Sequence, residues 1–198
     1  MTLYDAMLFV HLLTIAAAFF AVGMMLSSLL RLPACRDLRD AGAALRTASS
    51  IGRIMPIATL LLLVSGGVMT QAQWNWRTPW IDVGIVALLV VTAIGGGLIG
   101  SRERAMHRAI EAAGAGAVIP TAAPLLFDRT ILLANGVNVG IICGVMLLMV
   151  LKGSLIGSAA CVLAGAILGY AVAALATKRA AHLQDFTLIE EVRVETSV

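Results

Sequence analysis

Five long runs without a charged side chain constrain this chain more than any other feature of its sequence. The runs cover residues 6–30, 54–76, 83–101, 130–151 and 154–177. At about 1.5 Å of rise per helical residue, roughly 20 residues cross the ~30 Å hydrocarbon core of a bilayer. A transmembrane β-barrel would instead show alternating segments of about 10 residues. The runs therefore predict an all-α, polytopic membrane helix bundle with five transmembrane helices.

Composition agrees with a membrane environment. Hydrophobic residues make up 60% of the 198 residues and charged residues 13%, against about 25% charged residues in soluble domains. A globule of this size could not hide so much apolar surface from water, so we exclude a water-soluble globule, a disordered chain and a disulfide-rich secreted domain. Residues 1–177 are predicted to form the transmembrane domain, and residues 178–198 a cytoplasmic tail to which no regular structure is assigned.

The basic residues predict how the helices are oriented. Twelve of the 14 Lys and Arg residues follow the first, third or fifth run, and only Arg77 and Lys152 lie on the other side. Because cytoplasmic loops carry an excess of Lys and Arg, this split places the N-terminus outside and the C-terminus in the cytoplasm. Trp74, Trp76 and Trp80 agree, since Trp is enriched at membrane interfaces. The pattern predicts a multi-pass protein of the inner (cytoplasmic) membrane.

The net charge of +3 does not indicate nucleic-acid binding. The basic residues stand between apolar runs with few aromatic residues among them, so topology explains them. Cys35, Cys143 and Cys161 have neither metal-ligand nor disulfide spacing. The predicted partner of the chain is therefore the lipid bilayer.

Small residues recur every four positions on the last two runs. Lipid offers no hydrophobic drive between helices, and such stripes let two backbones approach closely. We predict that these runs form a tight hairpin that turns near Leu151–Ser154. The alternative is that one stripe makes a contact in a homo-oligomer or with a partner subunit. The glycines predicted to pack helices are Gly136, Gly140, Gly144, Gly157, Gly165 and Gly169.

A second face of the fourth run is soft, meaning that it carries flexible methionine side chains, and it is partly polar. Amides in hydrocarbon are costly unless they are paired, so this face should point into the bundle. The first and second runs carry similar faces, and the first, second and fourth helices are therefore predicted to surround a common interior. The face on the fourth run, at about 100° per residue, consists of Asn135, Asn138, Ile142, Met146 and Met149.

His11 is the only histidine within a predicted span, and an ionisable residue inside a membrane is a functional candidate by default. Histidine with methionine suits Cu(I), and a His/Met pair also ligates haem iron. The alternative is structural, with His11 bonded to Thr14 or a backbone carbonyl and methionines filling gaps. The candidate metal ligands are His11, Met7, Met69, Met146 and Met149, and His11 is also the candidate cofactor ligand.

Other catalytic chemistry is not indicated. The sequence contains no phosphate-binding loop, nucleophile elbow, zinc-protease motif or carboxylate pair within a span. His107 and His182 fall in the predicted cytoplasmic segments, where we expect them to be solvated. No catalytic residue is therefore assigned, and a non-enzymatic function is favoured.

Four segments resemble the family of predicted integral membrane proteins called domain of unknown function 2269. Within residues 4–175, they are YDAMLFVHLLTIAAAFFAVG with His11 and Gly23, PIATLLLLVSGGVMT, TPWI and GVMLLMVLKGSLIGSAACVLAGAILG. That family is loosely similar to the copper-resistance CopD membrane proteins and to HemJ-type haem-binding protoporphyrinogen oxidases. These groups share a histidine early in the first helix, which corresponds to His11. HemJ-type proteins use a further histidine in another span, which this chain lacks.

Three functional hypotheses follow from the residues and the resemblance. The first is binding or transport of a small ligand or a copper-like metal, in the outer half of the first, second and fourth helices. The second is a haem-binding membrane redox protein with His11 as an axial ligand. The third is a structural or accessory membrane subunit. An absorption spectrum and a copper analysis of the purified protein would separate them.

Overall fold

The computed structural model describes residues 2–31, 38–74, 76, 78–113 and 128–195. Within these ranges every element is a helix and there is no strand. Five helical segments are long and apolar enough to cross a membrane. The expectation of an all-α bundle with five membrane-compatible helices is therefore confirmed. Cys35, Arg36 and Arg77 lie outside the described residues.

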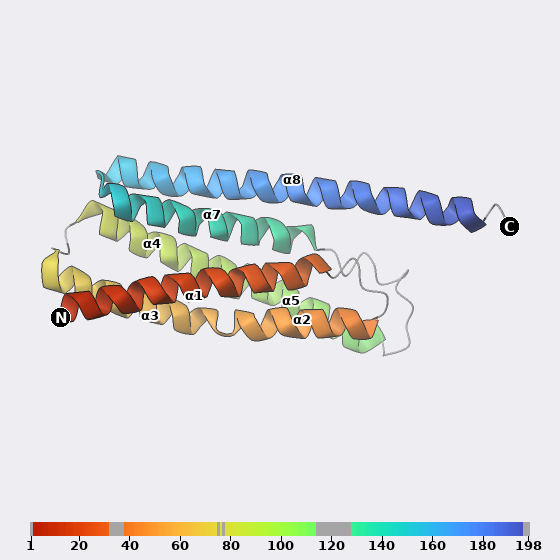
Figure 1. The fold of residues 1–198 in the computed structure, drawn as a ribbon, viewed down its shortest axis with the longest axis horizontal. Coiled ribbons are helices and arrows are strands. Elements are labelled where there is room, and N and C mark those ends of the chain that lie inside the picture. The colour runs from red at the N-terminus through yellow and green to blue at the C-terminus, as the bar shows by residue number, and fades with distance from the viewer. Residues whose placement is uncertain (1, 32–37, 75, 77, 114–127, 196–198) are drawn as a thin grey trace.

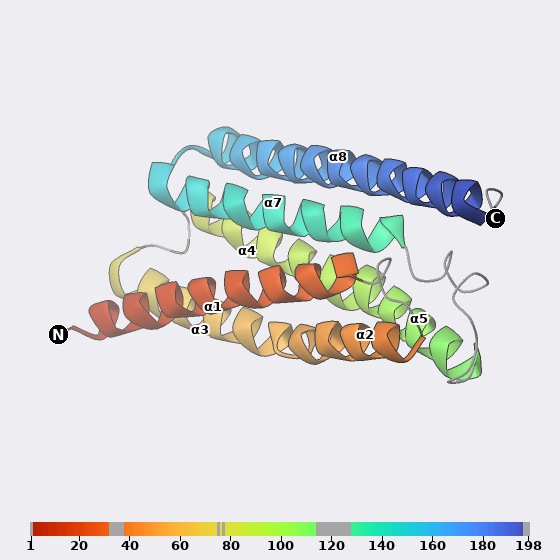
Figure 2. The same cartoon turned by 45° about the vertical axis from the view of Figure 1, so that its right-hand side comes forward.

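The long helices run side by side along the bundle (Figure 1). The N-terminus, the α3–α4 connection and the α7–α8 turn meet at one end, which we call the N-terminal end (Figures 1 and 2). The shorter helices α2 and α5 extend the bundle at the opposite end. The bounds are α1 Leu3–Arg31, α2 Leu38–Gly52, α3 Met55–Gln73, α4 Pro79–Ala93, η2 Ile94–Ile99, α5 Gly100–Ala113, α7 Arg129–Leu151 and α8 Leu155–Glu195.

Helices α2 and α3 follow one another with a short break at Arg53 and Ile54. Pro56 stands in the first turn of α3, and its ring nitrogen has no hydrogen to bond the preceding turn. The break separates an amphipathic helix from an apolar one. On α2, Ala41 and Leu45 are completely buried, against α1 and α5, which both pack on this helix.

The helical segment that holds the third apolar run begins before it, at Pro79, and continues past it to Ala113. Helices α4 and α5 are joined by a π-helix, Ile94–Ile99, that contains Gly95, Gly96 and Gly97. Glycine is a poor α-helix former, and single π-turns inside α-helices are frequent at functional sites. The run of glycines therefore coincides with a local change of helix type.

The best-packed core lies toward the end of the bundle opposite to the N-terminus. There the last turns of α1 meet α2, α5 and the first turns of α7. The core consists of Met25, Leu29, Ala41, Leu45, Ala48, Ile99, Met106, Ile131, Leu132 and Ala134. This cluster holds one end of the bundle together.

Helices α7 and α8 pack together more extensively than any other pair. A Cβ atom at Gly144 would lie 2.6 Å from the carbonyl oxygen of Cys161, and Gly140 meets the backbone of Gly165 at still closer range. Gly136 and Gly169 form a similar pair. The two stripes therefore face each other within one chain, which gives them an intramolecular partner in place of a second subunit.

Gly157 does not belong to this contact. A Cβ atom there would meet only Ser154 Oγ, at 3.5 Å. Its position next to the turn explains the difference, because α7 and α8 approach each other closely only from Cys161 onward. The sequence stripe therefore extends one position beyond the surface that the tertiary structure uses.

The hairpin turn and the tail complete the fold. Lys152 ends α7 in the left-handed region with φ 48°, a conformation that costs a non-glycine residue about 1 kcal/mol or more. Beyond residue 177, where no regular structure was assigned, α8 continues as a helix to Glu195. Continuous backbone hydrogen bonding from the preceding apolar helix accounts for this extension.

Candidate ligand-binding cavity

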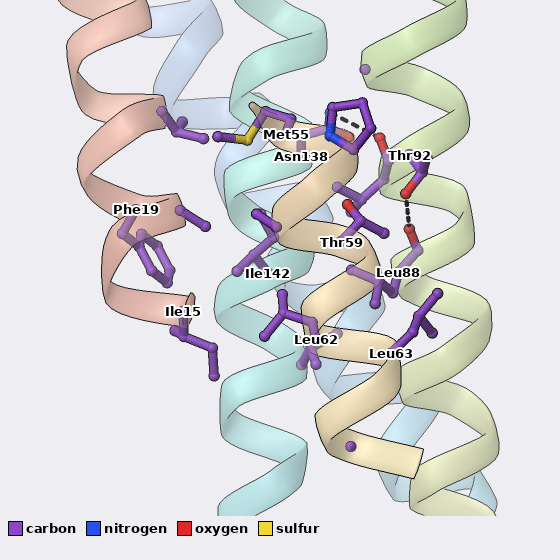
Figure 3. A pocket seen from close by; sticks show the side chains of 18 of the residues that line it. Ile15, Phe19, Met55, Thr59, Leu62, Leu63, Leu88, Thr92, Asn138 and Ile142 are labelled. Carbon is purple, nitrogen blue, oxygen red and sulfur yellow. Dashed lines mark hydrogen bonds between the residues drawn. The ribbon is translucent and has the colours of Figure 1, made fainter. Parts of the chain in front are cut away.

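A cavity of about 1150 Å³ lies between α1, α3, α4 and α7. Apolar side chains from all four helices point into it (Figure 3). They leave a space within the bundle whose walls are chiefly hydrocarbon. The side chains labelled there are Ile15 and Phe19 of α1, Met55, Thr59, Leu62 and Leu63 of α3, Leu88 and Thr92 of α4, and Asn138 and Ile142 of α7.

The sequence predicted three of these four walls. The soft faces of the first, second and fourth spans line the cavity through residues such as Ala18, Leu62 and Ile142. The contribution of α4, which includes Gly84 and Leu88, was missed. Its sequence is almost uniformly apolar, so no periodic face distinguishes the side that meets the cavity from the side that meets lipid.

Aromatic side chains lie at the N-terminal end of the cavity. Tyr4, Trp74, Trp76 and Trp80 all contribute to its lining. Trp74 and Trp80 stack edge to face with ring centroids 5.3 Å apart, and the ammonium nitrogen of Lys152 lies 4.6 Å from the centre of the Trp74 ring. Through the contact between Lys152 and Trp74, the α7–α8 turn packs against the end of α3.

His11 is 8% exposed and contributes to the cavity wall. Its Nδ1 lies 2.8 Å from Ser65 Oγ on α3, and Ser65 Oγ lies 2.6 Å from the carbonyl oxygen of Leu61. A carbonyl oxygen only accepts, so the Ser65 hydroxyl donates its hydrogen to Leu61. The bond between His11 and Ser65 must then be donated by Nδ1–H.

Two consequences follow for the neutral ring of His11. Its proton is on Nδ1, and Nε2 carries an unshared electron pair. In metal-ligating histidines, the ring nitrogen that does not bind the metal usually donates its hydrogen to another group, which fixes the orientation of the ring. Thr14, which sequence reasoning named as a partner, instead donates to the carbonyl oxygen of Val10. Ser65 was part of the polar face predicted on the second span, but its role was not recognised.

The two asparagines of α7 are buried, as their sequence face predicted. Asn135 is 2% exposed, and its Nδ2 donates to the carbonyl oxygen of Ile131 on its own helix. Asn138 is 9% exposed, and its Nδ2 donates across the bundle to the carbonyl oxygen of Val91, at 3.3 Å. Val91 lies three residues before Ile94, the first residue of the π-helix. Asn138 therefore connects α7 to the irregular part of the third span.

The opposite end of the cavity is polar. Ser49 Oγ lies 3.1 Å from His107 Nε2, and the hydroxyl of Ser49 also interacts with the carboxyl group of Glu103. All three residues contribute to the lining. The expectation that His107 is solvated is therefore wrong: packing of α2 against α5 half-buries its ring. The exposed residues Arg46, Arg53 and Arg104 surround this end.

The candidate metal ligands are brought together only in part. His11, Met69, Met146 and Met149 all contribute to the same cavity, whereas Met7 is not among its lining residues. In the part of the chain that the structure describes, no group of three or more His, Cys, Asp or Glu side chains could hold a metal ion. A metal in this cavity would therefore depend on thioether ligands in addition to His11.

Comparisons with protein families, with curated proteins and with solved structures find no match to this chain.

Proposed function

We propose that this protein binds a small, largely apolar molecule within the membrane, in the cavity between α1, α3, α4 and α7. The observation that carries the proposal is the cavity itself. Its volume of about 1150 Å³ is at or above the range of about 300–1,000 Å³ that is typical of ligand pockets. Apolar walls with few polar groups are also typical of such pockets.

His11 supplies the polar contact in this proposal. Its Nδ1 is held by Ser65, which orients the ring before any ligand arrives. A pre-oriented imidazole in an apolar cavity suits either a hydrogen bond to the ligand or coordination of a metal centre. The structural alternative, an accessory subunit without a ligand, gives no reason for a cavity of this size.

Haem is the second candidate, because the donor set fits one axial ligand. His11 Nε2 would hold the iron, and Met69, Met146 or Met149 of the same cavity would offer a thioether. Bound haem would supply one-electron chemistry, tuned by these ligands and by the apolar walls. A lone copper ion fits less well, because the cavity is far larger than one ion and Met7 does not contribute to it.

The family resemblance and the topology also belong to this proposal. The resemblance to the domain of unknown function 2269, with its looser similarity to copper and haem proteins, supports a cofactor at His11. The distribution of basic residues supports an inner-membrane protein with its N-terminus outside and its C-terminus in the cytoplasm. In that orientation, His11 and the tryptophans lie in the outer half of the membrane.

The cavity can be narrowed without a steric clash. Gly84 contributes to its wall, and a Cβ atom there would meet nothing within 4 Å. We expect Gly84→Phe to fold and to exclude the ligand. Gly97→Phe is the matched control, because Gly97 also has nothing within 4 Å and does not line the cavity.

Native mass spectrometry of the detergent-purified full chain tests the proposal. We expect a bound small molecule in the wild type and in Gly97→Phe, and its loss in Gly84→Phe. Equal occupancy in all three proteins would contradict binding in this cavity. An absorption spectrum identifies haem by a Soret band that His11→Ala abolishes, and elemental analysis identifies copper.

A further inference from the structure

Two arginines place their charged groups at the polar end of the cavity, near α2 and α5. Arg53 lies in the break between α2 and α3, and its Nη2 donates to Ser50 Oγ at 3.1 Å. Arg104 is on α5, and a Cβ atom at Gly100 would lie 3.3 Å from its Nη1. Ser50 and Gly100 line the cavity, as both arginines do. The guanidinium groups themselves, and not only their stems, therefore lie beside the lining.

The two arginines come from segments that approach each other. A Cβ atom at Gly52 would lie 4.0 Å from Glu103 Oε2, and these two residues directly precede Arg53 and Arg104. Both arginine side chains are exposed. A guanidinium group is planar and offers paired N–H donors that match the oxygens of a phosphate or carboxylate. Two such groups on facing segments suit one anionic group between them.

The positive charge at this end is not neutralised by an ion pair. In the part of the chain that the structure describes, neither Arg53 nor Arg104 forms one. Among the described lining residues, Glu103 is the only acid. Its carboxyl group interacts with the hydroxyl of Ser49, and its Oε1 is buried. The two guanidinium groups therefore keep donors for a further partner.

The arginine end continues into the apolar part of the cavity. Met55 and Leu62 lie along α3 on the cavity wall, and Phe19 of α1 points into the same space (Figure 3). Because lipid tails are as apolar as these side chains, the walls alone give a hydrocarbon little reason to leave the bilayer. A charged group held at the arginines would supply that preference.

We infer that the ligand of this cavity is an anionic lipid, whose acidic head group lies between Arg53 and Arg104 and whose hydrocarbon chain extends along the apolar walls. This inference rests on the proposed function and specifies its ligand class. Basic pockets between transmembrane helices on the cytoplasmic side of a membrane bind anionic lipid head groups. In the orientation proposed above, the arginine end lies on that side.

Three probes separate the contributions of head and chain. Myristoyl lysophosphatidic acid has an anionic phosphate and one chain, myristoyl lysophosphatidylcholine has the same chain and a head without net charge, and glycerol 3-phosphate has the head alone. Native mass spectrometry of the full chain in non-ionic detergent measures each titration. We expect the lysophosphatidic acid to bind about 10-fold more tightly than the lysophosphatidylcholine, because hydrogen bonds to charged groups are the stronger ones. Excess glycerol 3-phosphate should not displace it.

A pair of arginine variants tests the head-group site. Arg104→Gln removes a charge from the lining, whereas Arg108→Gln removes an exposed charge from the same helix that does not line the cavity. We expect Arg104→Gln to weaken binding of the lysophosphatidic acid about 5-fold, as one basic residue near an anionic lipid provides, and Arg108→Gln to leave it unchanged. Should Arg104→Gln fail to fold, Arg53→Gln replaces it.

A pair of glycine variants tests the site of the chain. Gly96 lines the cavity, and a Cβ atom there would meet nothing within 4 Å. The neighbouring Gly97 has the same free space and does not line the cavity. We expect Gly96→Phe to weaken binding of both lysolipids, and Gly97→Phe to bind them as the wild type does.

The outcomes separate this inference from the proposed function. If both lysolipids bind equally and Gly96→Phe weakens both, the cavity binds an amphiphile without recognising its charge, and the inference alone is wrong. Equal losses in Arg104→Gln and Arg108→Gln, or unchanged binding in Gly96→Phe, would assign the preference to the outer surface and overturn the inference. Displacement by glycerol 3-phosphate would also overturn it, in favour of a soluble phosphate compound. If neither lysolipid binds, the inference fails, and the molecule lost in Gly84→Phe still decides the proposed function.

Discussion

Polar side chains in this bundle are few, and hydrogen bonds determine what each one can do. His11 is the best example, because its partner Ser65 is itself committed to the carbonyl oxygen of Leu61. A ring that could hold its proton on either nitrogen is thereby restricted to one tautomer. The residues around His11 in the sequence do not reveal this hydrogen bond, since Ser65 is 54 positions away in the sequence.

Replacing Ser65 tests the tautomer of His11. In Ser65→Ala the buried Nδ1–H loses its acceptor, and we expect a loss of about 1–3 kcal/mol in unfolding free energy. Ser65→Thr is the control, because threonine keeps a hydroxyl that can bond the preceding turn. Nitrogen-15 NMR of labelled histidine should show a protonated Nδ1 in wild type and Ser65→Thr. A protonated Nε2 in the wild type would refute the assignment.

Asp128 stabilises the start of α7. Its Oδ1 accepts from the backbone N–H of Thr130 at 2.8 Å, and its Oδ2 pairs with Arg102 at 3.0 Å. We expect Asp128→Ala to destabilise the protein by about 1 kcal/mol through loss of the N-cap. The surface ion pair adds little, because exposed pairs contribute about 0–1 kcal/mol. Thermal unfolding in detergent measures the difference, and unchanged stability would contradict the capping role.

The same residue predicts a dependence on pH. Partial burial alone would raise the pKa of Asp128, but the hydrogen bonds from Arg102 and Thr130 outweigh it and lower the pKa below the usual carboxyl value. A lowered pKa in the folded state means that the stabilisation is present above the ordinary carboxyl pKa near 4 and is lost as pH falls through the folded value. The difference between wild type and Asp128→Ala should therefore begin to shrink as pH falls below about 4 and disappear once the pH lies below the lowered pKa of the folded state.

At the scale of elements, close backbone contact and open space occur in the same bundle. Helices α7 and α8 meet through glycine backbones, whereas α1 packs on α3 and α4 packs on α7, and these two pairs leave the cavity between them. Bulky residues such as Phe19 and Leu62 line the cavity. Glycines form the α7–α8 contact, because only small residues let two helix backbones approach so closely. The size of the side chains on each face therefore contributes to how closely two helices approach.

Large substitutions at the α7–α8 contact should be severe. In Gly140→Leu or Gly165→Leu, the new side chain would overlap the facing backbone, and neither helix can move without losing the rest of the contact. We expect a loss of about 3 kcal/mol or more, at the upper end of overpacking effects. Thermal unfolding of the purified protein in detergent measures it.

Gly157→Leu provides the control on the same stripe. Its Cβ atom would meet only Ser154 Oγ, at 3.5 Å, so we expect stability within about 0.5 kcal/mol of the wild type. If Gly140→Leu and Gly165→Leu behave like this control, α7 and α8 do not pack through their glycines.

At the scale of the whole molecule, the orientation in the membrane is the main open prediction. Thr47 of α2 and Ser154 of the α7–α8 turn are exposed, and these two elements lie toward opposite ends of the bundle (Figure 1). We expect Ser154→Cys to react with an impermeant thiol reagent in intact cells, and Thr47→Cys to react only after the membrane is opened. Both are placed in a chain whose native cysteines are replaced. The reverse labelling pattern would invert the proposed topology.

The sequence by itself determined the helices and their membrane character. Charge-free runs of about 20 residues have one stable form in hydrocarbon, and glycines four residues apart mark a face that tolerates close contact. The burial of Asn135 and Asn138 was also predictable, because an unpaired amide is costly in lipid. Each of these conclusions depends on the local cost of placing a residue type in hydrocarbon.

Only the tertiary structure decided how those faces combine. The uniformly apolar α4 carries no pattern that selects its cavity side, yet its Gly84 and Leu88 complete the wall. His107 is half-buried because α2 packs against α5, and His11 is oriented by a serine on another helix. These features arise from contacts between residues far apart in the chain, whose energies depend on distances that no local pattern contains.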